Sequence, residues 1–305
     1  MRAVRIHQPG DHTALVVEEA PLPPLATGDV LVEVRAAGLV PDELSWPGAW
    51  VDRAGRDRTP SVPAHEVAGV VSQVRYGTTG FDLGDRVFGL TDWHRDGAAA
   101  DYVAVEARNL ARVPSSADFV QAAALPIAGL TAWQGLFVHG RLQSGQTVVV
   151  HGAGGGTGAV AVQLAVDAGA RVIGTGRTNA AAVALGFGAA QFVDLDHERF
   201  DDAEVGQVDL LFDTIGGELL ERSAARVRFG GTLVSITSPP PVKPVGGRAL
   251  FFIVEPDRSQ LQELAHRVDG GRLRPHVGAT YSIPAAPQAF AAKRRGLLGK
   301  AVLTA

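Results

Sequence analysis

The chain has 305 residues, of which 46% are hydrophobic and 20% are charged, and its formal net charge is −4. One hydrophobic core seldom keeps growing at this length, so the sequence predicts two domains. The positive residues are scattered, which argues against the basic surface of a protein that binds nucleic acid or an anionic membrane.

The chain contains no cysteine. Disulfides, thiol nucleophiles and thiolate-ligated zinc sites are therefore excluded. The nine histidines show neither an H-x-x-x-H nor an H-E-x-x-H spacing, so no metal site is expected. No apolar run approaches the ~18 residues that span a bilayer, and we expect a soluble cytoplasmic protein.

In chain order, residues 1 to about 115 form short strand-like segments separated by Pro, Gly and Asp. From about residue 117 the sequence changes to an Ala-rich helix and then to strands that alternate with helices. These strands are expected at residues 147–150, 170–173, 191–193, 208–212 and 232–236. The alternation predicts a doubly wound parallel sheet. A Pro-rich stretch follows, then strand-like residues 249–254, a helix over 257–268 and a closing strand at 300–303.

The most informative stretch is the turn that joins the strand at 147–150 to the next helix. Gly152, Gly155 and Gly158 fall three residues apart in this turn, where backbone N–H groups can face a pyrophosphate. A side chain at any of the three is expected to crowd the phosphates. The apolar helix and the second strand complete a strand–helix–strand unit of about 30 residues. This context predicts a dinucleotide site rather than an ordinary Gly-rich loop.

The end of the second strand indicates which dinucleotide binds. A site for NAD places an Asp or Glu about 20 residues past the glycines, where it accepts hydrogen bonds from the ribose hydroxyls. No acid occurs between Asp167 and Asp194, and Arg177 occupies this region. A guanidinium fits a 2′-phosphate, so NADPH is the predicted cofactor. The alternative is that Arg177 is a surface residue that opens the next helix.

Several motifs, in their order and spacing, resemble the medium-chain dehydrogenase/reductase superfamily and its zinc-independent quinone oxidoreductase branch, which includes zeta-crystallin-like enzymes. They are Pro63-Ala-His-Glu-Val-Ala-Gly-Val-Val71, Gly84-Asp-Arg-Val-Phe-Gly89, Ala98-Ala-Ala-Asp-Tyr-Val103, Ala123-Ala-Leu-Pro-Ile-Ala-Gly-Leu-Thr-Ala-Trp133, His151-Gly-Ala-Gly-Gly-Gly-Thr-Gly158, Asp213-Thr-Ile-Gly-Gly217 and Gly299-Lys-Ala-Val-Leu303.

The resemblance implies an α/β protein with a GroES-like β-rich catalytic domain at residues 1–118 and a Rossmann doubly wound parallel-sheet NADP-binding domain at 119–272. A segment at 273–305 returns to the catalytic domain. A homodimer or homotetramer is also implied. The expected cofactor-binding residues are Thr131, Gly152, Ala153, Gly154, Gly155, Gly156, Thr157, Gly158, Thr175, Arg177, Phe252, Val254 and Lys300.

Two departures from the superfamily bear on the chemistry. Zinc-dependent members carry a Cys where this chain has Val40, so His65 and Glu66 are interpreted as structural remnants rather than metal ligands. Quinone reductases usually have Asn-Pro-x-Asp where this chain has Val40-Pro-Asp-Glu43. The missing Asn leaves the identity of the acceptor open.

A reduced nicotinamide can pass hydride to a quinone or to the β-carbon of an enone without a metal, whereas alcohol oxidation needs a base or a metal. The sequence therefore favours an NADPH-dependent oxidoreductase with a small electrophilic acceptor. The alternatives are a reductase of a specific aldehyde or secondary metabolite, and a non-catalytic NADPH-binding sensor.

No catalytic dyad is visible in the sequence. Flat aromatic walls suit a planar acceptor, and Arg95 or His94 can stabilise an enolate. The alternative is that the tryptophans only pack. The pocket candidates are Asp42, Trp46, Trp50, Asp92, Trp93 and Arg95.

Overall fold

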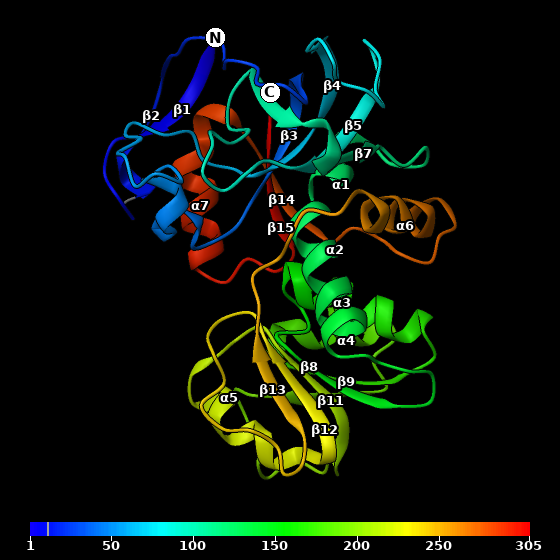
Figure 1. The fold of residues 1–305 in the computed structure, drawn as a ribbon. Coiled ribbons are helices and arrows are strands. Elements are labelled where there is room, and N and C mark those ends of the chain that lie inside the picture. The colour runs from blue at the N-terminus through cyan, green and yellow to red at the C-terminus, as the bar shows by residue number, and fades with distance from the viewer. Residues whose placement is uncertain (11) are drawn as a thin grey trace. The chain divides into compact units, whose positions relative to one another are not determined.

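The computed structural model describes residues 1–10 and 12–305, and the chain divides into two compact units (Figure 1). The β-rich unit contains residues 1–127, 256–271 and 275–305. The parallel-sheet unit contains residues 128–255 and 272–274. This division confirms the expected α/β class, with a β-rich part and a parallel-sheet part.

The β-rich unit is built on a seven-stranded sheet in the order β14-β15-β3-β4-β5-β7, with β6 also paired to β3. The red strand β15 lies beside the much earlier β3, with β14 on its other side, and Ala301 pairs antiparallel with Leu39 (Figure 1). The closing segment therefore returns to this sheet. The strands are β3 (Asp29–Leu39), β4 (Glu66–Val74), β5 (Arg86–Leu90), β6 (Tyr102–Glu106), β7 (Leu110–Arg112), β14 (Val277–Ser282) and β15 (Lys300–Thr304), and β1 (Arg2–Ile6) pairs separately with β2 (Leu15–Glu19).

The boundaries of the units differ from the expected ones at residues 118 and 272. Helices α1 (Phe119–Ala123) and α6 (Arg258–Asp269) belong to the β-rich unit. Polar contacts hold α6 there, because the Arg258 guanidinium donates to the Leu110 carbonyl at 3.0 Å. At the other end of the helix, the Asp269 carboxylate accepts from the Ser116 backbone N–H at 2.8 Å. The third helix of this unit is α7 (Ala286–Arg294).

The parallel-sheet unit contains a six-stranded sheet in the order β10-β9-β8-β11-β12-β13, and all neighbouring pairs are parallel. Val148, Val149 and Val150 of β8 are fully buried, as expected for a central strand covered on both faces. The strands are β8 (Thr147–His151), β9 (Arg171–Gly176), β10 (Gln191–Asp194), β11 (Val208–Asp213), β12 (Val227–Ser235) and β13 (Arg248–Phe251). The helices are α2 (Pro126–Trp133), which starts in the β-rich unit, α3 (Gly156–Asp167), α4 (Ala181–Gly186) and α5 (Gly217–Ser223).

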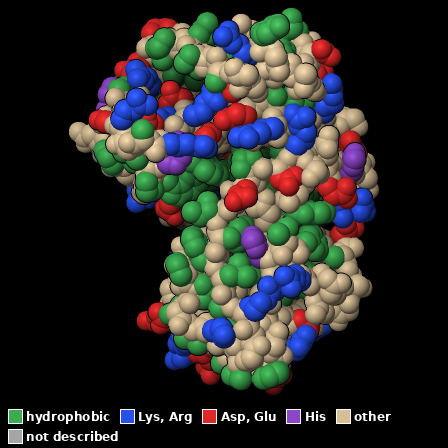
Figure 2. Space-filling model, in the orientation of Figure 1, with side chains coloured by type: hydrophobic (Ala, Val, Ile, Leu, Met, Phe, Trp, Pro, Cys, Tyr) green, Lys and Arg blue, Asp and Glu red, His purple; other side chains and the backbone are tan. Residues whose placement is uncertain are grey.

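Two surface properties bear on possible partners. In the part of the chain that the structure describes, no helix is both long enough and apolar enough to cross a membrane. On the face drawn in Figure 2, Lys and Arg side chains are interspersed with Asp and Glu side chains.

Candidate functional site

The turn between β8 and α3 is held in place by the neighbouring strand β9. The backbone N–H groups of Gly152 and Ala153 both donate to the Thr175 carbonyl at 3.0 Å. The Gly155 N–H then donates back to the Gly152 carbonyl at 2.9 Å, which closes the turn. Helix α3 begins directly afterwards at Gly156. Since the first N–H groups of a helix have no partner within it, those at the start of α3 are suited to an anion.

Gly152, Gly155 and Gly158 differ in what an added side chain would meet. Gly152 has φ of +77°, and a Cβ there would lie 2.3 Å from the Thr214 hydroxyl oxygen. A Cβ on Gly158 would lie 2.1 Å from the Gly152 carbonyl oxygen. At Gly155 the nearest atom to an added Cβ, the same carbonyl oxygen, is 3.2 Å away.

The expectation that side chains at these three positions would crowd the phosphates stays a prediction, and the structure adds a separate steric reason at two of them. The protein itself excludes a side chain at Gly152 and at Gly158, whereas Gly155 faces open space apart from one contact. The N-terminus of α3 with this open position fits the pyrophosphate of a dinucleotide.

Thr175 and His151 lie beneath the turn and support it. The Thr175 side chain is buried, and its hydroxyl lies 2.8 Å from Nδ1 of His151. The other ring nitrogen of His151 lies 2.8 Å from the Ser223 hydroxyl. Burial lowers the pKa of His151 to about 4, so the ring is neutral at pH 7. In the structure the Thr175 carbonyl supports the turn and its hydroxyl engages His151, and the contact of Thr175 to the cofactor stays a prediction.

Asp213 ties together the ends of β11 and β12 beside this turn. Its buried carboxylate accepts from the backbone N–H of Gly216 at 3.1 Å and from the Ser235 hydroxyl at 3.0 Å. The next residue, Thr214, donates its hydroxyl to the His151 carbonyl at 2.7 Å. The motif Asp213-Thr-Ile-Gly-Gly217 thus fixes the carboxyl ends of the central strands, which is the edge where parallel sheets bind ligands.

Gln134 contributes to the positioning of the segment that contains Phe252 and Val254, and no sequence motif had indicated it. Gln134 begins a π-helical stretch, Gln134–His139, directly after α2. Its side chain donates to the Glu255 carbonyl at 2.8 Å and accepts from the Glu255 N–H at 3.1 Å. π-Helical turns are often found at functional sites. The predicted cofactor residues Phe252, Val254 and Thr131 are all buried in this unit.

Arg177 lies at the carboxyl end of β9, where the sequence predicts a contact to a 2′-phosphate. Its side chain is exposed and, among residues 1–10 and 12–305, forms no ion pair. The sheet also brings acids to this place, because Asp194 of β10 pairs in register with Gly176 of β9. Asp194 and Asp196 were not predicted as part of the site, because the acid of an NAD site is expected at the end of the second strand, whereas these two lie at the end of β10 and just after it.

The pocket candidates in the β-rich unit do not form one cluster. The rings of Trp46 and Trp93 meet edge to face at 5.0 Å between centroids, and the His65 ring lies 5.4 Å from that of Trp93. Trp50 is instead buried in the core, where its indole N–H donates to the Leu44 carbonyl at 2.8 Å. Asp42 is exposed.

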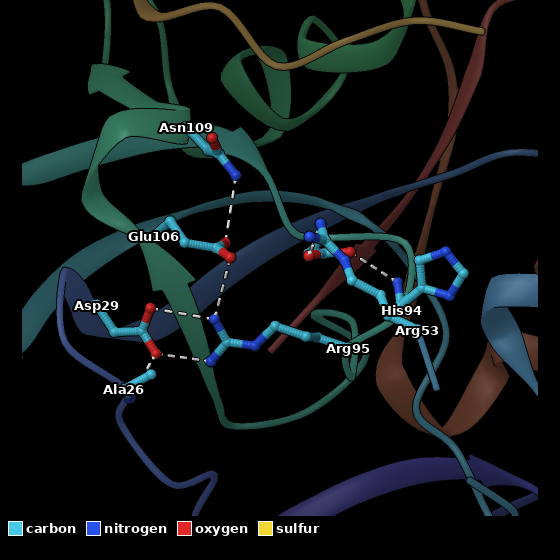
Figure 3. A network of polar contacts seen from close by, with 8 residues as sticks. Ala26, Asp29, Arg53, His94, Arg95, Glu106 and Asn109 are labelled. Carbon is cyan, nitrogen blue, oxygen red and sulfur yellow. Dashed lines mark hydrogen bonds and ion pairs between the residues drawn. The ribbon is translucent and has the colours of Figure 1, made fainter. Parts of the chain in front are cut away.

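Arg95 and Asp92 are engaged in polar networks of the β-rich unit, and Figure 3 shows Arg95 beside Asp29 and Glu106. The Arg95 guanidinium donates to both carboxylate oxygens of buried Asp29, at 2.7 and 3.1 Å, and lies 3.4 Å from Glu106. Asp92 accepts from Arg53 at 2.5 Å and from the backbone N–H of His94 at 2.9 Å. With its charge neutralised by two acids, Arg95 has a structural role here, and this disfavours the predicted contact to an enolate.

A buried charged cluster lies at the start of β4. Glu66 accepts from the Ile127 N–H at 2.8 Å and pairs with the ammonium of Lys300. Burial raises the pKa of Glu66, and the positive charge of Lys300 opposes that rise. Lys300 is 5% exposed and also donates to the Leu39 carbonyl. This pairing disfavours the cofactor contact predicted for Lys300.

His65 and Glu43 form the second part of the buried cluster. Nδ1 of His65 lies 3.7 Å from Oε2 of Glu43, while Oε1 of Glu43 accepts from the Ala64 N–H at 3.0 Å. Within the described ranges, Oε2 of Glu43 and both ring nitrogens of His65 are buried without a hydrogen bond. In the same ranges, no group of three or more possible ligands is arranged to hold a metal ion.

Two family models match the chain. The alcohol dehydrogenase GroES-like domain matches residues 26–115, and the zinc-binding dehydrogenase model matches residues 187–303. A 2-methylene-furan-3-one reductase from Solanum lycopersicum is 31% identical over 84% of this chain and 66% of that protein. A chloroplastic NADPH-dependent alkenal/one oxidoreductase from Arabidopsis thaliana has the same identity and coverage. The chain thus spans slightly less than two thirds of the length of these two relatives.

The fold has close counterparts among solved structures. The quinone oxidoreductase from Coxiella burnetii superposes with a TM-score of 0.92 and is 25% identical, covering 100% of this chain and 99% of its own.

Proposed function

The chain belongs to the medium-chain dehydrogenase/reductase superfamily, and on that premise we propose that it is an NADPH-dependent reductase of quinones or α,β-unsaturated carbonyl compounds. The observation that carries this proposal is the turn at Gly152–Gly158, which presents the start of α3 and leaves the position beside Gly155 open. The names of the two plant relatives support an acceptor with a conjugated double bond.

The residues of this chain would hold the dinucleotide at its pyrophosphate and at its 2′-phosphate. The backbone N–H groups at the start of α3 stabilise the pyrophosphate, helped by the positive end of the helix dipole. The guanidinium of Arg177 pairs with the 2′-phosphate. Gly155 has no side chain, so the pyrophosphate can approach the backbone closely.

A bound reduced nicotinamide supplies hydride, and a conjugated acceptor takes it at the β-carbon without prior activation. The electron pair of the double bond then moves toward the carbonyl oxygen, and a proton on the α-carbon completes the reduction. The chain must therefore stabilise negative charge only transiently. The rings of Trp46 and Trp93 meet edge to face, and the face of either ring offers an apolar surface to a planar acceptor in the β-rich unit.

Zinc does not fit the donor set, although the name of one matching family refers to it. The chain has no thiolate, and the ring nitrogens of His65 lie among Glu43 and two tryptophans rather than among further ligands. A tetrahedral zinc site requires four donors, or three and a water. No step is therefore assigned to a metal.

The proposal is tested by following the absorbance of NADPH with a panel of quinones, enones and saturated aldehydes, with and without EDTA. We expect oxidation of NADPH by the conjugated acceptors and no effect of EDTA. Turnover of saturated aldehydes alone would indicate an aldehyde reductase, and NADPH binding without turnover of any acceptor would indicate a sensor. Loss of activity with EDTA would contradict the metal-free reaction.

Cofactor choice is tested separately with Arg177→Ala. This variant should lose most of its preference for NADPH over NADH, because the charge that pairs with the 2′-phosphate is gone. Lys243→Ala is the matched control, since it also removes one exposed cation but lies beyond β12. An unchanged NADPH preference in Arg177→Ala would refute the assignment of this contact.

A further inference from the structure

The loop that follows β10 is fastened to the loop that contains Arg177. Asp194 ends β10 and pairs with Gly176 of β9, and the next N–H, from Leu195, donates to the Gly176 carbonyl at 2.8 Å. These backbone contacts bring the side chains that follow β10 alongside Thr178, the residue directly after Arg177.

The two donors of Thr178 are both taken by carboxylates. Its hydroxyl donates to Oδ2 of Asp194 at 2.7 Å, and its backbone N–H donates to Oδ2 of Asp196 at 3.0 Å. Asp196 also lies 3.3 Å from the Thr178 hydroxyl. His197 completes the cluster, with Nδ1 3.0 Å from Asp194.

The surroundings of Asp194 favour the charged form of its carboxylate. The hydrogen bond from Thr178 lowers the pKa of Asp194, and contacts to the Asp196 N–H and to His197 act in the same direction. Asp196 is exposed and receives two of the donated hydrogen bonds. The loop beside the exposed guanidinium of Arg177 therefore contains two negative charges.

A 2′-phosphate and a ribose hydroxyl respond oppositely to such a loop. A phosphate next to Arg177 needs N–H and O–H donors and is repelled by carboxylates. A ribose with a free 2′-hydroxyl donates hydrogen bonds, and carboxylates are the acceptors used at NAD sites. The loop thus combines one cation that favours NADPH with two anions that oppose it.

We propose that Asp194 and Asp196 are specificity-determining residues of the nucleotide site, which occupy the donors of Thr178 and restrict the preference for a 2′-phosphorylated dinucleotide. The inference rests on the proposed function, because it concerns the nucleotide site of that same reductase. It predicts that the wild-type protein uses both dinucleotides, and that each Asp→Asn substitution increases the discrimination in favour of the phosphate.

The test measures binding and does not depend on turnover. Isothermal titration calorimetry gives the dissociation constants of 2′,5′-ADP, which contains the 2′-phosphate, and of 5′-AMP, which lacks it. The dissociation constant of 5′-AMP divided by that of 2′,5′-ADP reports the contribution of the 2′-phosphate to binding. In Asp196→Asn and in Asp194→Asn the amide oxygen still accepts from Thr178, so the loop is retained while one charge is lost. We expect each substitution to raise this ratio about five- to tenfold, as for the loss of one charge from an exposed loop beside the phosphate.

Glu221→Gln is the matched control, because it also removes one exposed negative charge but lies on α5, which follows β11 on the other side of β8. The ratio of the two dissociation constants for Glu221→Gln should equal that of the wild type, and the melting temperatures of all variants should agree.

The outcomes separate this inference from the proposed function. If the ratio in both Asp variants stays at the value of Glu221→Gln, or if it falls, the inference is wrong even when the protein binds both nucleotides. If the wild-type protein binds neither 2′,5′-ADP nor 5′-AMP, the proposed function fails first.

Discussion

Gly155→Ala should weaken binding of the cofactor without destabilising the fold, because among Gly152, Gly155 and Gly158 only Gly155 has room for a side chain within the protein. Its backbone has φ of −74° and ψ of 175°, which alanine adopts without strain. The added Cβ would meet only the Gly152 carbonyl oxygen, at 3.2 Å. The small crowding is offset by the gain of about 0.4–1 kcal/mol from a less flexible unfolded chain. We expect a free energy of unfolding within about 1 kcal/mol of wild type, or about 4 °C in melting temperature.

Gly158→Ala should behave in the opposite way. Its Cβ would lie 2.1 Å from the Gly152 carbonyl oxygen and 2.7 Å from the carbonyl carbon, and both atoms belong to the backbone of the turn. Overpacking of this kind costs about 3 kcal/mol or more, so the melting temperature should fall by about 6–12 °C.

The two variants are compared by differential scanning calorimetry and by titration with NADPH, with Gly186→Ala as a control. Gly186 lies in the same unit, and an added Cβ would meet nothing within 4 Å. In Gly155→Ala the added Cβ should keep the pyrophosphate from approaching the backbone closely. Because one hydrogen bond to a charged phosphate is worth about 1.5–3 kcal/mol, this variant should bind NADPH about ten- to a hundredfold more weakly. If Gly155→Ala melts as low as Gly158→Ala, or if it binds NADPH as tightly as Gly186→Ala does, the reasoning about this turn is wrong.

Three further predictions concern ionisable groups that are buried or partly buried, and each is measured as a change in the free energy of unfolding. Lys300→Met leaves the Glu66 carboxylate buried without its cation, and the free energy of unfolding should fall by about 3–5 kcal/mol. The double variant Lys300→Met, Glu66→Gln should recover most of this loss. Equal stability of the single and double variants would contradict a stabilising ion pair. The pKa of His151 is about 4 in the folded protein, so the unfolded chain binds the extra proton and stability should fall by about 3 kcal/mol as the pH drops from 6.5 to 4. His151→Gln should lose this component, and an unchanged pH profile would show that another group is responsible. Burial lowers the pKa of Lys293 to about 8, so stability should instead rise between pH 8 and about 10, by roughly 3 kcal/mol. The free energy of unfolding of Lys293→Met should depend less steeply on pH than that of the wild type over this range, and the two slopes should be the same below pH 7.

The sequence was sufficient to predict the parallel sheet, because its buried strands are continuous apolar runs such as Val148–Val150. It was not sufficient to assign helix α6, whose place depends on Arg258 reaching the carbonyls of Ala107 and Leu110. Such contacts join residues 148 or more positions apart and leave no local pattern.

The candidate site shows the same limit. The glycine turn was located correctly because its backbone requirements are local, but what an added side chain would meet at Gly152, Gly155 and Gly158 depends on which atoms lie beside them. Arg95 and Lys300 are long basic side chains whose partners, Asp29 and Glu66, come from other strands of the sheet. Sequence spacing shows that a charge is present, whereas only the fold shows which opposite charge it meets.

The pairing of β15 with β3 determines the order in which this protein can fold during synthesis. Lys300 meets the Leu39 carbonyl across a separation of 261 residues, and the whole parallel-sheet unit is synthesised in between. Domains usually fold one after another as they emerge from the ribosome, starting with the first. Here the earlier sheet lacks two of its strands, β14 and β15, until the inserted unit has been made. The inserted unit is therefore expected to reach its native structure first. A ribosome-bound chain that stops before β14 should display the edge of β3 at residues 36–39, which pairs with β15 in the native sheet, to chaperones or to other chains.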